Sequence, residues 1–270
     1  NSEKESAIKK LQEKQYGNGG FPWFKGMEPN KYITTHITAG FGKMKKMGIS
    51  EDSRVTEMMK KSVSYLDYNM NRVYNDIKEK KRYHISYSDI HYLYARSFYL
   101  DSPVSSEYKE SYNYFINHAK LQRRDGNKYM QAMTAIALYR NGEIQTAKEI
   151  MKSIKEYALE SEELGMWWKS EGYGFYWHEA KIEKQSMMIE AFSEIASNPE
   201  DIESMKVWLL KNKQTNSWET TKATVEAVYA LLMNGTKLLS ETKTADIKLG
   251  SKNFDEVFGK VEDKNSGTGY

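Results

Sequence analysis

Histidine and tyrosine are the residue types in this chain best suited to chemistry, because cysteine is absent. Without a thiol there is no cysteine nucleophile, no disulfide and no cysteine-ligated metal. The five histidines include His36 and His91, and the chain has 20 tyrosines. Tyr and His side chains serve as acid and base in proton-transfer catalysis. Aromatic rings also stack on sugars, so this content favours a carbohydrate-active enzyme as one hypothesis.

Other catalytic motifs are incomplete. Residues 177–184, WHEAKIEK, are similar to the zinc motif HExxH, but Ile182 occupies the position of the second histidine. A glycosidase needs two carboxylates roughly 5–10 Å apart, and sequence alone does not place such a pair. The motifs therefore predict no catalytic residue, no cofactor and no metal.

The charge pattern gives no indication of a nucleic-acid or membrane partner. The net charge is only +3, and basic clusters such as KEKKR at 78–82 are short and include acidic residues. No apolar run approaches the ~20 residues of a membrane-spanning helix, and no signal peptide is visible. From this segment we expect neither nucleic-acid binding nor direct membrane contact.

Polar turns recur at a spacing that indicates a helical repeat. Gly126 and Gly172 are 46 positions apart, and Gly172 and Asn216 are 44 apart. Gly19 precedes Gly126 by 107 positions, about two such periods, so a further turn is expected at 75–85. Repeats of ~45–50 residues are typical of stacked or circularised helical hairpins.

Apolar periodicity predicts about ten helices in five hairpins, with a more buried and a more exposed helix in alternation. The more buried helices are expected at 32–44, 87–100, 128–140, 181–196 and 219–235, and the more charged ones include 51–70 and 142–160. Helix starts are expected at Ser50, Ser88 and Thr220, and helix-ending glycines at Gly48, Gly142 and Gly235.

These patterns predict an all-α domain over residues 1–235, an α/α toroid of helical hairpins like that of terpenoid cyclases and prenyltransferases. Those enzymes need an Asp-rich motif or a cysteine zinc ligand, which the sequence lacks. A closed toroid commonly has about six hairpins, so we expect the first hairpin to be missing and the chain to be part of a longer protein. In residues 236–270, alternation at 242–262 predicts a β-hairpin from a neighbouring β domain.

Two segments carry more specific motifs: QYGNGGFPWFKG at 15–26, followed by YITTHITAGFGKM at 32–44, and NSWETTKATVEAVYALLMNG at 216–235. Together they resemble the thioester-containing domain of α2-macroglobulins and complement thioester proteins, most closely the bacterial α2-macroglobulin-like proteins. In that family a Gln, a glycine turn and an aromatic residue precede a Thr-rich inner helix, and a Ser/Trp turn precedes the last one. The likeness covers roughly residues 8–235 and implies a toroid inserted in a β domain.

The family's reactive centre lies upstream of its first glycine turn, in a Cys-Gly-Glu-Gln type motif that forms an internal thioester. The absence of cysteine implies that this hairpin is not part of the chain; some bacterial members lack the motif altogether. His91, in SYSDIHYLYARSF, resembles a histidine of complement-type members that takes over the acyl group. A capping or hydrogen-bonded histidine is the alternative. His36, at helical spacing from Tyr32, is expected to be a core or rim residue.

The stretch NGGFPWFKG at 18–26 is expected to form an architectural corner. Its glycines permit positive φ and close chain approach, and its rings would seal the inner barrel. The turn and rim residues in this prediction are Gly19, Gly20, Phe21, Trp23 and Phe24, with Trp218 in the last turn. The alternative is that Trp23 and Phe24 line a ligand groove.

The resemblance implies a non-catalytic structural module of a bacterial endopeptidase inhibitor. In the family, a protease cuts an exposed bait region elsewhere in a very large protein, and the resulting rearrangement captures the protease. The expected partners are target proteases, through the full-length protein, and neighbouring β domains of the same chain. The expected location is the periplasm, the cell envelope or the extracellular space. A polysaccharide lyase or glycosidase, and a plain scaffold or peptide-binding repeat, remain as alternatives.

Overall fold

The computed structural model describes residues 2–49, 52–80, 82–169, 180–213, 217–218, 220–233, 248–249 and 252–253. The chain divides into two compact units, Asn1–Asn234 and Gly235–Tyr270. The first unit is built from α-helices, so the prediction of an all-α class is confirmed for it.

Within the described residues the first unit contains ten α-helices. They are α1 (Ser2–Lys14), α2 (Lys31–Lys46), α3 (Ser53–Ile77), α4 (Tyr87–Arg96), α5 (Lys109–Leu121), α6 (Lys128–Arg140), α7 (Ile144–Lys155), α8 (Lys181–Ala191), α9 (Pro199–Lys211) and α10 (Thr221–Leu232). Three of these helices continue into or follow a short turn of another helical type. The 3₁₀ turn η1 (Ser97–Tyr99) follows α4, the 3₁₀ turn η2 (Ser106–Tyr108) precedes α5, and the π-helical turn η4 (Phe192–Ala196) follows α8.

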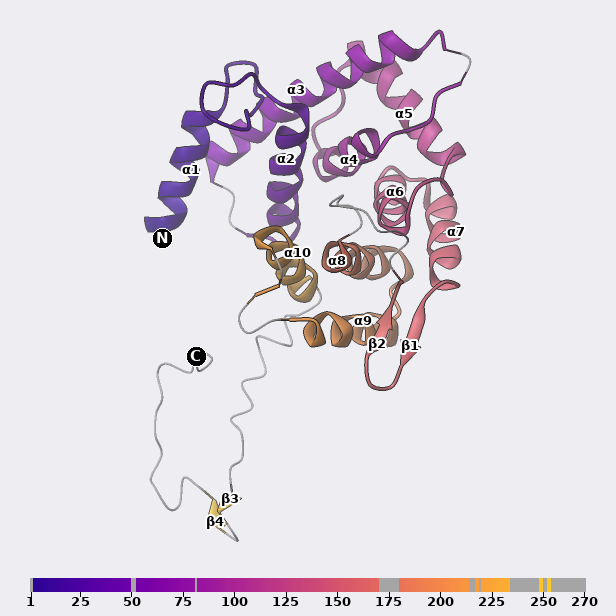
Figure 1. Cartoon of the computed structure of the whole chain (residues 1–270). Helices are drawn as coiled ribbons and strands as arrows, with labels where there is room; N and C mark the ends of the chain where they lie inside the picture. Colours follow the sequence, from indigo (N-terminus) through magenta and orange to yellow (C-terminus); the bar gives the residue numbers. More distant parts are fainter. Residues whose placement is uncertain are drawn as a thin grey trace. The chain divides into compact units, whose positions relative to one another are not determined.

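The even-numbered helices form a series in which each packs against the next: α2 on α4, α4 on α6, α6 on α8, and α8 on α10. The odd-numbered helices pack outside this series, α3 against α2, α5 against α4 and α6, α7 against α6, and α9 against α8. Figure 1 shows α4, α6 and α8 in the interior, with α3, α5, α7 and α9 around them.

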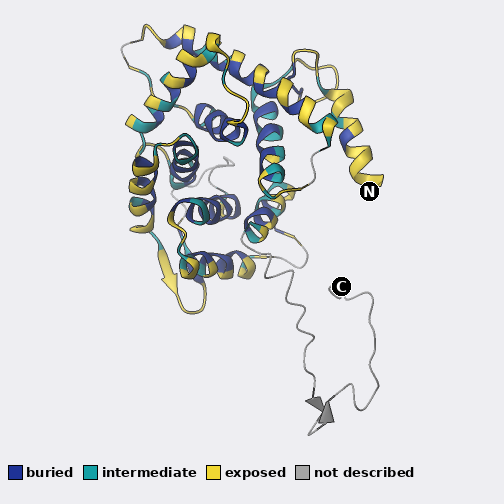
Figure 2. Cartoon of the chain, turned by 180° about the vertical axis from the view of Figure 1, so that it is seen from behind, coloured by how far each residue is buried: buried dark blue, intermediate teal, exposed yellow. Residues whose placement is uncertain are grey.

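Burial follows the same alternation. Most residues of α4, α6 and α8 are buried, whereas α7 buries only the face that carries Ala147, Ile150 and Ile154. Figure 2 shows this contrast between dark blue inner helices and outer helices with exposed stripes. The expected alternation of buried and exposed helices is confirmed for α4, α6 and α8, whereas α2 and α10 bury only part of their surface.

Helix termini confirm some expected caps and correct others. Thr220 caps α10, accepting from the amide of Ala223, while Gly48 and Gly142 follow α2 and α6 with positive φ. Ser88 is not a cap, because α4 begins at Tyr87 and its N-cap is Ser86, which forms a reciprocal capping box with Asp89. Asp52 rather than Ser50 caps α3. Ser50 and Gly235 lie outside the described residues.

The end of one predicted helix belongs to a β-hairpin. The charged helix expected at 142–160 ends at Lys155, and β1 (Leu159–Ser161) then pairs antiparallel with β2 (Gly165–Trp167). Gly165 has φ +76° and packs so close to α9 that a Cβ would lie 2.1 Å from the carbonyl oxygen of Ser204. Close contact with α9 fixes β2 in place, a long-range effect that helical periodicity does not report.

In the second unit the described residues form β3 (Lys248–Leu249) and β4 (Lys252–Asn253), an antiparallel pair. Lys248 pairs with Asn253 and Leu249 with Lys252. This pair falls inside the range 242–262 for which the sequence predicts a hairpin.

Candidate functional site

Aromatic and imidazole rings from α2, α4 and α6 form a continuous ladder. Ring centroids of Trp23 and Tyr32 are 5.9 Å apart, and Tyr32 stacks on His36 at 6.5 Å. His36 lies 6.4 Å from His91, which lies 5.5 Å from Tyr87, and Tyr87 stacks on Tyr129 at 6.3 Å. The helical order α2–α4–α6 thus brings residues spread over more than 100 positions into one row; we call these six rings the ring ladder.

The two histidines of the ladder are held neutral. Burial lowers the pKa of His91 well below its usual 6.5, and the charges of neighbouring groups, His36 and Lys222 first among them, lower it further. Burial and Lys222 also lower the pKa of His36. A neutral imidazole offers one N–H donor and one nitrogen acceptor.

His91 is a buried residue of α4. Ser86 caps α4, and in the described part of the chain His91 is fixed by ring contacts with Tyr32, His36 and Tyr87 rather than by a hydrogen bond. His36 is half-buried and stacked on Tyr32, the rim position predicted for it.

A cavity of about 460 Å³ opens between α2 and α10 and reaches the ring ladder. His36, Tyr87, His91 and Tyr129 line it on one side. The remaining lining is largely apolar, with Met133 and Met187 at its base and Val225 and Val228 on α10. We call this space the α2–α10 cavity.

An ion pair crosses the same gap. The ammonium of Lys43 on α2 donates to the carboxylate of Glu226 on α10, and both side chains are largely buried. Burial alone raises the pKa of Glu226, but the charge of Lys43 and its hydrogen bond outweigh that effect and lower the pKa below 4.5. Glu226 is therefore ionised at neutral pH.

Two carboxylates of α8 and η4, Glu190 and Glu194, are also paired. Glu190 accepts from the Tyr94 hydroxyl and from Arg140 at 2.9 Å. Glu194 pairs with Arg140 and with Lys46. Hydrogen bonds from cations favour the ionised form of a carboxylate. The ionised form carries no proton that it could donate to a sugar.

The corner at 18–26 is built around one glutamine and one buried ring. The amide of Gln15 donates to the carbonyls of Gly19 (3.0 Å) and Met58 (2.9 Å), joining the turn to α3. Gly19 has φ +90°, and a Cβ there would lie 2.2 Å from the carbonyl oxygen of Lys61. A Cβ on Gly20 would meet Pro29 and Tyr65. These contacts explain why glycine stands at both positions.

The three rings of this corner differ in role. Phe21 is buried and its amide donates to Thr34 Oγ1 at 2.8 Å. Trp23 is 43% exposed and ends the ring ladder, and Phe24 is 73% exposed. The prediction that the rings seal the inner barrel is wrong for Phe24, because its side chain faces solvent.

Trp218 is the counterpart of Phe21 in the last turn. It is buried, its indole donates to the carbonyl of Leu209 in α9 (2.9 Å), and its amide donates to Thr224 Oγ1 in α10 (3.1 Å). Trp168, which the sequence analysis missed, donates from its indole to Ile154 of α7 at 2.9 Å. Trp168 and Trp218 are 50 positions apart, a spacing within the repeat period that would have indicated the match.

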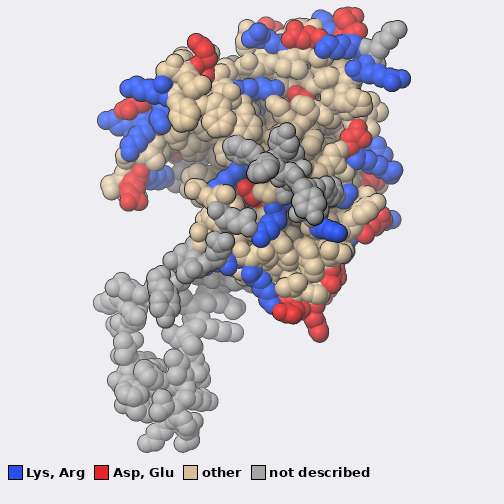
Figure 3. Space-filling model, viewed as in Figure 1, with Lys and Arg blue, Asp and Glu red and all other residues tan. Residues whose placement is uncertain are grey.

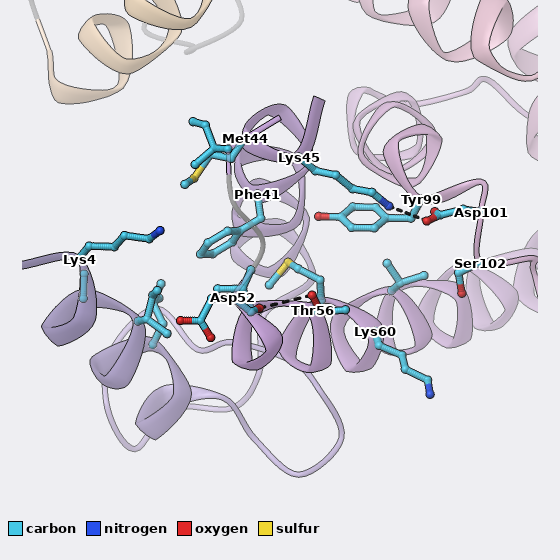
Figure 4. A pocket seen from close by; sticks show the side chains of 17 residues that line it. Lys4, Phe41, Met44, Lys45, Asp52, Thr56, Lys60, Tyr99, Asp101 and Ser102 are labelled. Carbon is cyan, nitrogen blue, oxygen red and sulfur yellow. Dashed lines mark hydrogen bonds and ion pairs between the residues drawn. The ribbon is translucent and has the colours of Figure 1, made fainter. Parts of the chain in front are cut away.

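A second apolar pocket of about 390 Å³ lies between α1, α2 and α3. Figure 4 shows Phe41 and Met44 of α2 on its wall, with Lys4, Asp52 and Lys60 at its edge. The cation of Lys45 pairs with Asp101 beside it at 2.6 Å. Its lining also includes the hydroxyls of Thr56, Tyr99 and Ser102.

On the face shown in Figure 3, Lys and Arg side chains alternate with Asp and Glu, without a large region of one sign. No cluster of His, Asp or Glu in the described ranges is suited to hold a metal ion. Across those ranges, too, no helix has the length and apolar character that crossing a bilayer requires. Of the segment 177–184, which is similar to HExxH, residues 177–179 lie outside the described residues.

Comparison of the chain with protein-family models gives no match. Comparison with curated proteins gives none either.

Proposed function

We propose that the chain is the helical module of a bacterial α2-macroglobulin-like endopeptidase inhibitor, and that its helices form an α/α toroid. The module has no catalytic function of its own. It acts as a rigid body that a bait-cleaved parent protein brings against the attacking protease.

The observation that carries the proposal concerns the two segments that resemble the family. They lie at opposite ends of the helical unit in sequence, yet Lys43 of α2 pairs with Glu226 of α10. In the series α2–α4–α6–α8–α10 this pair joins the last helix to the first. A ring of inner helices is the arrangement in which first and last members meet.

The two segments also share local construction. The amide of Phe21 donates to Thr34 Oγ1, and the amide of Trp218 donates to Thr224 Oγ1. In each case a buried aromatic residue of the turn is fixed to a threonine of the next inner helix. This shared detail gives the Thr-rich pattern of both motifs a structural role.

A second candidate, a carbohydrate-active toroid enzyme, is favoured by one observation: the ring ladder contains Tyr87 and His91 in contact and ends at the half-exposed Trp23. Against it, Glu190, Glu194 and Glu226 are each paired with a cation. We therefore rank the trap module first.

The test of the first candidate uses the full-length parent protein and a panel of endopeptidases. A trap should abolish cleavage of a large protein substrate while leaving cleavage of a small peptide substrate largely intact, because the captured protease keeps its active site. Deleting residues 1–235 should remove the protection. Protection that persists without this region contradicts the proposal.

The second candidate is tested on the isolated 270-residue chain with a panel of acidic and neutral polysaccharides. We expect no release of reducing ends or unsaturated sugars. Turnover that is lost in both His91→Ala and Tyr87→Phe, but kept in the exposed control His84→Ala, would establish the enzyme instead.

A further inference from the structure

The α2–α10 cavity contains a buried polar group that the protein itself does not satisfy. Tyr229 of α10 lines the cavity and is only 4% exposed, and among the described residues its hydroxyl is the one buried side-chain oxygen or nitrogen without a hydrogen-bond partner. Leaving a buried hydroxyl unpaired costs about 1–3 kcal/mol. An unpaired hydroxyl beside a cavity therefore indicates a ligand that supplies the missing partner.

Three groups that line the cavity, Tyr229, His36 and His91, can each donate one hydrogen bond. Burial, and after it the neighbouring Glu190, raise the pKa of Tyr229, so the hydroxyl keeps its proton. His36 and His91 also line the cavity, each with one N–H, and neither donates to another protein group in the described part of the chain. A carboxylate is an acceptor-only group and matches such a set.

The charge of the lining also favours an anionic ligand. Its charged residues are Lys43, Lys222 and Glu226, which together carry a net charge of +1. Lys43 also lies 4.9 Å from the centroid of the Tyr229 ring. The two ammonium groups attract an anion more than a cation, although Glu226 and Glu183 already balance part of their charge.

The rest of the cavity requires an apolar body. Met133, Met187, Ile37 and Phe41 are among its lining residues. Methionine side chains adapt to flexible aliphatic chains. The volume of about 460 Å³ lies within the range of small-molecule sites, roughly 300–1,000 Å³.

We propose that the α2–α10 cavity is a binding site for a small amphipathic monocarboxylate of the medium-chain fatty acid class. The carboxylate accepts hydrogen bonds from Tyr229 and the imidazoles, and the aliphatic chain lies against the methionines. This site is independent of the trap function: its ligand binds the helical module itself.

The test is calorimetric titration of the 270-residue chain with octanoate, with 1-octanol as the neutral probe of equal chain length. Octanoate should bind, and octanol should bind about tenfold more weakly or worse, because it lacks the charge and one acceptor oxygen. Equal affinity for the two probes, or no binding of octanoate, overturns the proposal.

Tyr229→Phe tests the contact directly, with Tyr157→Phe on the exposed side of the molecule as its control. Tyr229→Phe should weaken octanoate binding several-fold while raising the midpoint of thermal unfolding, because it removes an unsatisfied buried hydroxyl. Tyr157→Phe should change neither. Unchanged octanoate affinity in Tyr229→Phe contradicts the assignment.

Methyl resonances of labelled methionine locate the ligand without any substitution. Met133 and Met187 line the cavity and should shift on addition of octanoate, whereas Met205, buried outside the lining of the cavity, should not. Shifts confined to other methionines would place the ligand elsewhere and overturn the proposal.

Discussion

Lys43 in α2 and Glu226 in α10 form an ion pair across 183 positions of sequence, with side chains 7% and 13% exposed. Removing one partner from a buried pair leaves the other charge without compensation, which is far more costly than removing both. We therefore expect the pair to stabilise the association of α10 with α2.

We expect Glu226→Gln to lower the free energy of unfolding by about 3–5 kcal/mol, measured by urea denaturation at pH 7. The double variant Lys43→Met, Glu226→Leu should recover most of the loss, because no unpaired charge remains. Asp101→Asn, which removes a solvent-exposed partner of Lys45, is the matched control and should cost less than about 1 kcal/mol. A small effect of Glu226→Gln alone would show that the pair does not stabilise the fold.

Phe21 and Phe24 provide a second matched pair, three positions apart in the same corner. Phe21→Ala should cost about 3–5 kcal/mol, since it empties a fully buried ring position. Phe24→Ala removes a ring that is 73% exposed and should leave stability within about 0.5 kcal/mol. Chemical denaturation of both variants measures the difference. Equal losses would mean that Phe24 is covered in solution.

Gly19→Ala should destabilise the corner although it adds only one methyl group. The residue has φ +90°, and the new Cβ would meet the carbonyl of Lys61 at 2.2 Å, so the backbone of the turn must move. Gly17→Ala, with no heavy atom within 4 Å of its Cβ position, is the control. We expect a loss above about 1 kcal/mol at Gly19 and little change at Gly17, measured by thermal unfolding. Similar midpoints for the two variants would contradict this assignment.

Local sequence signals predicted the helices better than their ends. The helix at 128–140 has the predicted bounds because Asn127 caps its start and Gly142 follows its end. The cap of α4 was misplaced because two serines, Ser86 and Ser88, lie close together at the start of the helix. Only the three-residue spacing from Ser86 to Asp89 produces a capping box, and that spacing was present in the sequence.

The site was less accessible to sequence analysis because its contacts are long-range. Arg140 and Glu190 are 50 positions apart and lie on α6 and α8, whose adjacency follows from the packing order and not from any local pattern. The unpaired hydroxyl of Tyr229 is likewise invisible in a sequence with 20 tyrosines. His36 and His91 were identified as candidates, but their contact with each other was not predicted.

The buried imidazole of His91 makes stability depend on pH in a predictable direction. Its pKa is lowered well below 6.5 by burial and by neighbouring positive groups, so below pH 6.5 the unfolded chain binds a proton that the folded chain does not. Stability is therefore complete above about pH 7.5 and falls on acidification, by up to about 1.4 kcal/mol per pH unit from this group. Glu226 acts in a separate window: its lowered pKa removes stability only below about pH 4.5.

His91→Phe keeps a ring beside Tyr87 but removes the imidazole that titrates. As the pH falls from 7.5 to 5, the wild type should therefore lose more free energy of unfolding than this variant does. His84→Gln, at an exposed position in the connection before α4, should follow the wild type throughout. Urea denaturation at half-unit pH intervals measures both differences. Parallel curves for the wild type and His91→Phe would show that His91 takes up a proton as readily in the folded chain as in the unfolded one, and the interior position of its ring would then have to be abandoned.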